Sequence, residues 1–276
     1  MQVFFSLPLL LCHVTVVTGV AGCHGDRDKD NRPRQNCTAG GFSDIPSGLD
    51  PTTEVLLLPV NQLSSLSWSN YKMFPDIYEI DLTTNKIHAL LAGSAGVLLL
   101  SLRVLRLGSN DMEILRDGSF SPCPSLTELY LPHNALTSLP DNIFAGLSKL
   151  EILDLSSNKI SVLPPNLIQP LIAIETLYMD YNKIQVMPDD WFSVKDIPYL
   201  YLSANPWLCS CSLGYLNGYL NDYEINVYVR DGADINGDAE SVVCASPESS
   251  WGEWLTHYLP SMPWGVILPS DSPSAE

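Results

Sequence analysis

Three cysteines near the end of the chain are the residues best suited to covalent chemistry. Cys209 and Cys211 stand one residue apart in NPWLCSCSLGYLNGYLNDY, and Cys244 is the one cysteine that follows them. Thiols form disulfides in oxidising compartments and bind zinc as thiolates, so a disulfide and a three-cysteine zinc site both fit these residues. Because two neighbouring thiols compete for one later partner, a disulfide leaves the other thiol unpaired.

The start of the chain favours an oxidising compartment. Residues 1–22 are apolar, end in the small residues Ala21 and Gly22, and precede an abruptly polar stretch, as in a cleaved secretory signal peptide. No Lys or Arg precedes the apolar run, and VAGC at 20–23 also resembles a bacterial lipidation box; a retained signal anchor is a third reading. We expect secretion, with no later run long enough to span a membrane and six cysteines left after cleavage.

The charge of the chain favours a protein partner over a nucleic acid. Its formal net charge is −17, from 31 acidic and 14 basic residues. Nucleic acid phosphates require a basic surface, whereas an acidic surface attracts basic partners. We therefore expect a basic protein ligand and no nucleic acid.

The remaining motifs indicate neither catalysis nor metal binding. None of the five histidines lies in a recognisable nucleophile motif, and no phosphate-binding glycine loop occurs. The stretch DGADINGDAE at 231–240 resembles a calcium loop, but counting from Asp234 it has Ala239 where glycine is required and Ala245 where glutamate is required. We expect no enzyme, no cofactor and no metal, and we interpret this stretch as an acidic flexible loop.

One asparagine recurs through most of the chain at intervals of 24, 25, 24, 24, 24 and 23 residues. It stands in the pattern LxxLxLxxNxL, as in LTELYLPHNAL at 126–136. Seven matches in phase identify a leucine-rich repeat array, in which each repeat buries its apolar face only by stacking on its neighbours. The seven asparagines are Asn61, Asn85, Asn110, Asn134, Asn158, Asn182 and Asn205.

The repeat register predicts the core and the fold class. Residues three and five before each asparagine point inward from a short parallel strand, and an apolar residue recurs five positions after it. We predict an α/β solenoid: a leucine-rich repeat horseshoe with a parallel concave sheet and a cysteine-bearing cap at each end. Cys123 occupies a leucine slot, equivalent to Leu98 and Leu147, and is therefore expected to be a buried, unpaired thiol.

Side chains two, four and six residues before each asparagine project onto the concave face. Its acidic and aromatic half spans about 15–20 Å at a strand spacing of about 4.8 Å, which is the size of a protein footprint. Acidic residues such as Glu79 and Asp81 are interpreted as solvated. Exposed aromatic residues are typical of protein contacts, so four tyrosines are predicted to touch a partner: Tyr130, Tyr178, Tyr199 and Tyr201.

Both ends of a solenoid need covers. At the front, Cys23 and Cys37 bracket a stretch expected to form a disulfide-closed loop or hairpin, and Asn36-Cys37-Thr38 is the only glycosylation sequon. At the back, Trp207 is placed to pack on the last repeat, and a short helix is expected to bury Leu213, Leu216 and Leu220. A Cys209–Cys244 disulfide would lock that helix, leaving Cys211 free, shielded or bonded to another chain.

These features predict five segments. Residues 1–22 are the signal peptide, 23–52 the N-terminal cysteine cap with its hairpin, and 53–204 the repeats. Residues 205–246 are the C-terminal cysteine cap, with a switch-like loop at 227–242, and 247–276 an irregular tail.

The C-terminal flank carries a more specific resemblance. NPWLCSC, NVYV and Gly232-x-Asp234 occur in this order, and residues 23–244 resemble the ligand-binding ectodomain of the platelet glycoprotein Ib alpha family. The resemblance implies a cell-adhesion glycoprotein of haemostasis and blood coagulation that binds von Willebrand factor through the concave face and the loop 227–242. The positions that match its ligand-contacting motifs are Glu128, Glu175, Thr176 and Tyr228, with the aromatic pair Tyr199 and Tyr201 and, in the loop, Asp234.

Several features depart from that family. Seven repeats occur where about eight are expected, Ile152 replaces a basic concave residue, and the tail lacks the acidic, tyrosine-containing run that binds thrombin. The stalk and membrane helix are missing, so we expect a secreted product, or a cell-surface one if a fuller product carries them. The alternative function is a soluble leucine-rich repeat protein that binds another signalling or pathogen-derived ligand.

Overall fold

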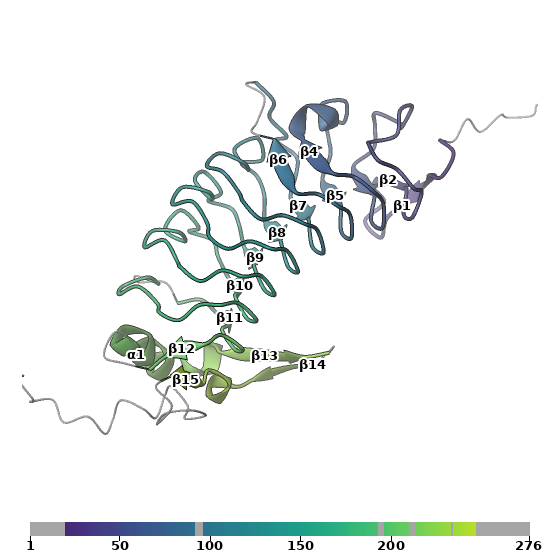
Figure 1. Ribbon diagram of the computed structural model, residues 1–276. Coiled ribbons are helices and arrows are strands. Elements are labelled where there is room, and N and C mark those ends of the chain that lie inside the picture. The colour runs from purple at the N-terminus through teal and green to yellow at the C-terminus, as the bar shows by residue number, and fades with distance from the viewer. Residues whose placement is uncertain (1–19, 92–95, 193–195, 210–212, 233, 247–276) are drawn as a thin grey trace, which may run out of the picture.

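The computed structural model describes residues 20–91, 96–192, 196–209, 213–232 and 234–246 (Figure 1). The predicted signal peptide lies outside these residues except for its last three positions. The predicted tail 247–276 and Cys211 also lie outside them, so neither the tail nor the state of the Cys211 thiol is described.

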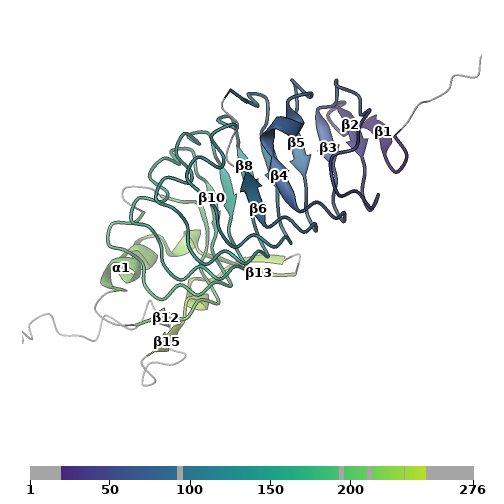
Figure 2. The same cartoon turned by 45° about the horizontal axis from the view of Figure 1, so that its top comes forward.

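A nine-stranded sheet lines the concave side of the solenoid (Figures 1 and 2). All neighbouring strands are parallel except β1, which pairs antiparallel with β2 to form the N-terminal hairpin. The order follows the chain, as a repeat array requires, and this confirms the predicted fold class. The strands are β1 (His24–Arg27), β2 (Pro33–Asn36), β3 (Val55–Leu57), β5 (Glu79–Asp81), β7 (Val104–Arg106), β8 (Glu128–Tyr130), β9 (Ile152–Asp154), β10 (Thr176–Tyr178) and β11 (Tyr199–Tyr201).

The other side of the solenoid is mostly turns. Strands β4 (Ser65–Ser67) and β6 (Ala89–Leu91) pair in parallel there, and the short 3-10 helix η1 (Trp68–Tyr71) follows β4. Between the two sides lies a continuous apolar core, in which the predicted inward-pointing residues three and five before each asparagine are all buried. Cys123 is buried with no exposed surface, as its leucine slot predicts.

The repeated asparagines form a buried ladder of hydrogen bonds. The amide nitrogen of Asn134 donates to the carbonyl oxygens of Leu107 at 3.0 Å and Leu131 at 3.1 Å, and its amide oxygen accepts the N–H of Met112 at 3.1 Å. One side chain thus satisfies backbone groups of two successive repeats, which explains its strict recurrence. The residue before each asparagine has a left-handed φ between 53° and 58°, and these are Val60, Thr84, Ser109, His133, Ser157, Tyr181 and Ala204.

Both predicted caps contain the expected disulfides. Cys23 is bonded to Cys37 at the open end of the β1–β2 hairpin, and Cys209 is bonded to Cys244. The second bond connects the residue that follows strand β12 (Trp207–Leu208) to the first residue of strand β15 (Cys244–Ser246), and these two strands pair in parallel. It also uses two of the three thiols that the alternative zinc site needed.

The C-terminal cap covers the last repeat with aromatic and leucine side chains. Trp207 is fully buried and its indole N–H donates to the Leu202 carbonyl at 3.3 Å. The predicted helix is α1 (Gly214–Asp222), and the three leucines expected beneath it, Leu213, Leu216 and Leu220, are all buried. A one-turn 3-10 helix, η3 (Glu224–Asn226), leads from α1 into the next strand.

Two expectations are wrong. Leu98 is 61% exposed and Leu99 is buried in its place, because this repeat has 25 residues and the extra one shifts the slot by one position. The stretch expected to be a flexible loop is a β-hairpin, formed by β13 (Tyr228–Asp231) and β14 (Asp234–Gly237) and followed by the 3-10 helix η4 (Ala239–Ser241). A β-bridge between Leu200 and Val227 attaches the start of this hairpin to the last strand of the sheet, so the hairpin is held against the repeats.

Candidate protein-binding face

The concave face holds two polar clusters, one over the middle of the sheet and one over its C-terminal end. The first, here the N-terminal cluster, consists of Glu79, Arg106, Glu128 and Tyr130 on strands β5, β7 and β8. The Arg106 guanidinium donates to Glu79 at 3.0 Å, lies 3.7 Å from the Glu128 carboxylate and stands 4.4 Å above the Tyr130 ring. All four residues are partly exposed, so this cluster forms part of the surface that a ligand would meet.

The hydrogen bonds of the N-terminal cluster also position its tyrosine. The Tyr130 hydroxyl donates to the Glu128 carboxylate at 2.8 Å. Burial raises the pKa of Tyr130 to about 12, and the bond to Glu128 acts in the same direction. Tyr130 is therefore a fixed hydrogen-bond donor at neutral pH, with the Arg106 guanidinium over its ring.

The second cluster, here the C-terminal cluster, is built around Arg230 of the β13–β14 hairpin, which we call the C-flank hairpin. The Arg230 guanidinium donates to Ser156 at 3.0 Å and to both carboxylate oxygens of Asp180 at 3.2 Å. It lies 3.6 Å from Asp154 and 4.2 Å above the ring of Tyr178. The Arg230 side chain of strand β13 thus lies over the repeats that contain β9 and β10, among carboxylates and aromatic rings.

The carboxylates of the C-terminal cluster are largely removed from water. The side chains of Asp154 and Asp180 are only 6% and 4% exposed, whereas that of Arg230 is 32% exposed. Burial raises the pKa of Asp180, while the adjacent Arg230 guanidinium and its hydrogen bonds act in the opposite direction. Without Arg230, two buried negative charges would face each other with no cation between them.

Four tyrosines extend the C-terminal cluster into an aromatic surface. The rings of Tyr178 and Tyr201 stack with centroids 4.2 Å apart, and Tyr228 of the hairpin lies 5.3 Å from Tyr199 and 6.1 Å from Tyr201. Tyr199 is 45% exposed, whereas Tyr201 is 2% exposed. The expectation that Tyr201 is an exposed contact is therefore wrong for the structure as described, because Tyr228 and Arg230 cover it.

The structure distributes the predicted contact residues over four places. Tyr178, Tyr199, Tyr201 and Tyr228 come together in the C-terminal cluster, while Glu128 and Tyr130 belong to the N-terminal one. Glu175 is exposed immediately before β10 and Thr176 is half-buried at its start. Asp234 is exposed in β14, at the outer strand of the hairpin.

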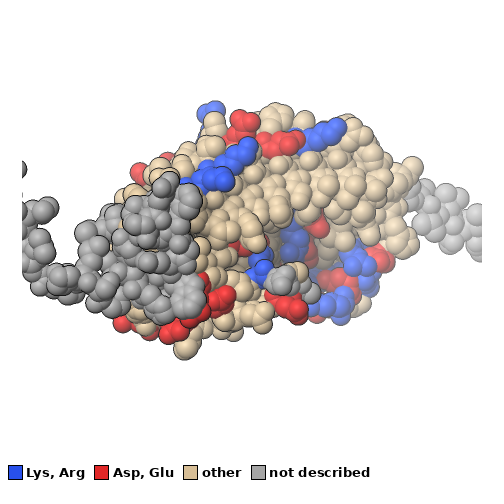
Figure 3. Space-filling view, turned by 60° about the horizontal axis from the view of Figure 1, so that its bottom comes forward, with Lys and Arg blue, Asp and Glu red and all other residues tan. Residues whose placement is uncertain are grey.

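Arg230 is the residue that sequence reasoning missed. It stands two positions after Tyr228, and residues two apart in a strand share one face, so a strand at 227–230 would have placed it beside that tyrosine. It also changes the charge of the face. Arg106 and Arg230 each contact two carboxylates, so two negative charges of this face are balanced by cations within it, and Figure 3 shows acidic and basic side chains next to each other.

Comparisons with known proteins agree with this architecture. The family model described as leucine rich repeat matches residues 75–136 and 124–184. Human 5T4 (Wnt-activated inhibitory factor 1, trophoblast glycoprotein) has a similar fold, with a TM-score of 0.60 and 22% identity over 88% of this chain and 97% of that chain. A phospholipase A2 inhibitor from Gloydius brevicaudus siniticus is 39% identical over 57 residues, which are 21% of this chain and 14% of that relative.

Together these findings support the leucine-rich repeat family, whose fold is typical of protein-interaction modules. The two disulfides and the fold indicate an extracellular domain. Within the part of the chain that is described, no helix has the length and apolar character needed to cross a bilayer, and no three His, Cys, Asp or Glu residues are arranged to hold a metal ion.

Proposed function

We propose that this chain is the ligand-binding domain of an extracellular adhesion protein of the platelet glycoprotein Ib alpha type, which binds a von Willebrand factor-like protein. The ligand would lie across the concave face, between the N-terminal hairpin and the β13–β14 hairpin. The domain limits proposed for it are the cap 23–52, the repeats 53–204 and the cap 205–246. The observation that supports this most is the C-terminal cluster, which joins the repeat sheet and the C-flank hairpin into one aromatic surface.

The arrangement fits a protein ligand on physical grounds. From β8 to β11 the face crosses four strands, or about 15 Å at a spacing of about 4.8 Å per strand. Tyr199 and Tyr228 offer large, rigid contact area, while Glu128, Glu175 and Thr176 supply polar groups around it. Aromatic residues with a polar rim are typical of the energetically dominant part of protein interfaces.

Direct binding of the full chain to von Willebrand factor from the same organism tests the proposal. Glu128→Ala and Tyr228→Ala should each weaken binding at least about tenfold, as expected for truncation of an interface anchor. Glu113→Ala is the matched control for the first, because Glu113 is an exposed carboxylate beyond the asparagine ladder rather than on the concave face. Folded wild type that does not bind would contradict the von Willebrand factor assignment and leave the fold unaffected.

A soluble protein that captures another extracellular ligand is the second candidate. The relative named as a phospholipase A2 inhibitor motivates it, although the alignment covers only 57 residues. Binding to a secreted phospholipase A2 would favour this candidate, provided that Glu128→Ala and Tyr228→Ala also weaken that binding. Full binding by both variants would place any such contact outside the concave face.

A further inference from the structure

The N-terminal cap carries a candidate modification site, the side chain of Asn36, which belongs to neither cluster. Asn36-Cys37-Thr38 is an acceptor triplet for N-linked glycans, and it is the only one in the 276-residue sequence. A disulfide-bonded domain that passes through the secretory pathway meets the enzyme that modifies such triplets. The acceptor amide ends β2, the second strand of the concave sheet.

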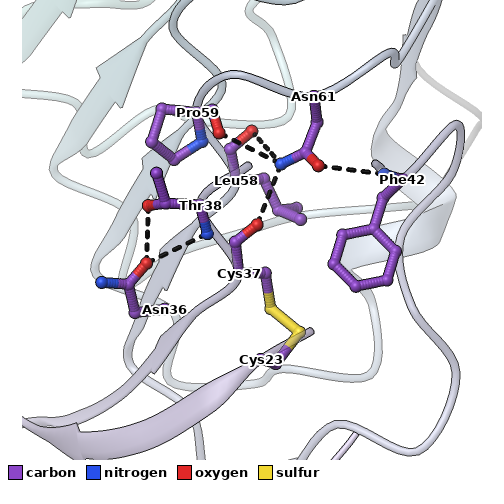
Figure 4. Close-up of a disulfide and its surroundings, with 8 residues drawn as sticks. All are labelled: Cys23, Asn36, Cys37, Thr38, Phe42, Leu58, Pro59 and Asn61. Carbon is purple, nitrogen blue, oxygen red and sulfur yellow. Dashed lines mark hydrogen bonds between the residues drawn. A yellow bond between two sulfur atoms is a disulfide. The ribbon is translucent and has the colours of Figure 1, made fainter. Parts of the chain in front are cut away.

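The sheet register puts Asn36 in the same row as the two clusters. Asn36 pairs with Leu57, which pairs with Asp81, and the row continues through Arg106 and Tyr130. The next residue, Cys37, is fully buried, so Asn36 faces the opposite way, toward the concave side. Figure 4 shows its amide turned away from Asn61 and from the disulfide.

The local hydrogen bonds leave the reactive atom available. The Asn36 amide oxygen accepts the Thr38 N–H at 3.0 Å and the Thr38 hydroxyl at 2.6 Å, and both bonds lie at the surface. Glycosylation occurs at the other atom of the amide, Nδ2. Across the hairpin, Asn36 is paired with His24, which is exposed, so that side of the amide is open to solvent.

We propose that Asn36 carries an N-linked glycan that stands over the N-terminal end of the concave face and shields Leu57 and Asp81 there. The donor is a lipid-linked oligosaccharide pyrophosphate. A bond forms between Asn36 Nδ2 and the sugar C1, the bond from C1 to the pyrophosphate oxygen breaks, and Nδ2 loses a proton.

The position of the glycan sets which residues it covers. Leu57 is in the neighbouring strand and half-buried, so it lies directly beside the sugar. Tyr130 is four strands away in the order β2-β3-β5-β7-β8, or about 19 Å at a spacing of about 4.8 Å. A branched glycan on a flexible side chain would screen Leu57 and Asp81 while leaving the C-terminal cluster open.

Mass spectrometry of the full chain made in animal cells, taken from both cells and medium, tests occupancy. We expect a glycan at Asn36 that a peptide N-glycosidase removes, and that is absent from both Asn36→Gln and Thr38→Ala. Thr38→Ser keeps the triplet and should keep the glycan, which separates loss of the acceptor from misfolding. An unmodified Asn36 in the wild-type chain from both sources would overturn the proposal.

Thiol labelling tests the placement and needs no ligand, so its result is independent of the proposed function. Leu57→Cys and Thr176→Cys introduce thiols at two half-buried concave positions, one beside Asn36 and one on β10. We expect removal of the glycan to speed labelling of Leu57→Cys by a polyethylene glycol maleimide at least threefold and to leave Thr176→Cys unchanged. Equal rates before and after glycan removal at both positions would overturn the proposed shielding.

Discussion

The two clusters of the concave face have nearly the same chemistry and different origins. In each, an arginine lies on a tyrosine ring, at 4.4 Å for Arg106 and 4.2 Å for Arg230, and contacts two carboxylates. Arg106 is a member of the sheet, and its partners are on nearby strands. Arg230 belongs to the C-flank hairpin, and its partners Asp154 and Asp180 are 76 and 50 residues earlier in the chain.

The N-terminal cluster is therefore a fixed part of the concave face, whereas the C-terminal cluster depends on the C-flank hairpin docking on the sheet. The register of the repeats places Arg106 between Glu79 and Glu128 whenever the sheet forms. The C-terminal cluster exists only while the β13–β14 hairpin lies on the sheet, because that hairpin supplies both Tyr228 and Arg230. The same hairpin covers Tyr201, so its position decides how much aromatic surface a ligand meets.

The largest effect should come from removing the disulfide that holds the C-terminal cap. Cys209→Ser with Cys244→Ser opens a loop of 35 residues, which lowers the free energy of unfolding by about 4 kcal/mol on loop-entropy grounds. The C-terminal cluster should be lost before the repeats unfold. Urea denaturation followed by tryptophan fluorescence and by hydrogen exchange measures both effects.

The disulfide at the other end is the matched control. Cys23→Ser with Cys37→Ser opens a 14-residue loop, for which the same relation gives about 3 kcal/mol. Hydrogen exchange in β13 and β14 should stay unchanged in this variant. If opening either disulfide exposed the C-flank hairpin equally, the dependence of the C-terminal cluster on its own cap would be wrong.

The next largest effect should distinguish the two arginines. Arg230→Ala leaves Asp154 and Asp180 buried without a cation, which we expect to cost about 2 kcal/mol, less than for a fully buried pair because Arg230 is partly exposed. Arg106→Ala leaves carboxylates that are 20% and 30% exposed, so about 1 kcal/mol is expected. Urea denaturation gives both values.

Hydrogen exchange adds a qualitative test to the same pair of variants. Arg230→Ala should raise exchange rates throughout β13 and β14, whereas Arg106→Ala should leave them at the wild-type level. Arg230→Lys keeps the charge but loses the planar donors that reach Ser156 and Asp180 together, so an intermediate rate is expected. Unchanged exchange in Arg230→Ala would mean that the Leu200–Val227 bridge alone holds the hairpin.

The contrast between the clusters also marks how far the sequence could predict the structure. The core pairs, the asparagine ladder and the row containing Arg106 and Tyr130 follow from a spacing that recurs, so these positions could be predicted directly from the sequence. Two expectations there were wrong. Leu98 was expected in place of Leu99, in the repeat that has an extra residue, and Glu79 was interpreted as solvated although it accepts a hydrogen bond from Arg106. Such positions are predictable because the same type of residue recurs at the same place in several repeats.

The C-terminal cluster had no such support. The flank occurs once, so its docking depends on tertiary contacts that no local pattern encodes. The exposure of Tyr201 was wrong for that reason, because the residues that cover it are 27 and 29 positions later. Tyr228 could be identified only through the family resemblance, and Arg230 needed the strand at 228–231, which was interpreted as part of a flexible loop.

A smaller effect should follow from removing one hydroxyl in the N-terminal cluster. Tyr130→Phe loses the 2.8 Å hydrogen bond to Glu128 and keeps the ring under Arg106, so the free energy of unfolding should fall by about 1 kcal/mol or less. Because the raised pKa of about 12 keeps the hydroxyl protonated in the folded chain, its contribution is present below pH 10 and is lost as pH rises through 12. The difference in the free energy of unfolding between Tyr130→Phe and wild type, measured by urea denaturation, should therefore shrink between pH 10 and 12. A difference that stays constant over this range would contradict the role assigned to the hydroxyl.

The smallest effect should appear at the opposite end of the pH scale, in the C-terminal cluster. Burial raises the pKa of Asp180 above its ordinary value of 3.8, so the folded chain takes up this proton at a higher pH than the unfolded chain does. The folded state is therefore stabilised relative to Asp180→Asn as pH falls from neutral through the raised pKa toward 3.8. Protonation also weakens the attraction to Arg230, which offsets part of the gain and keeps the effect below that of Arg230→Ala. Urea denaturation of both chains across this range measures it, and parallel curves would mean that the Arg230 guanidinium cancels the effect of burial on Asp180.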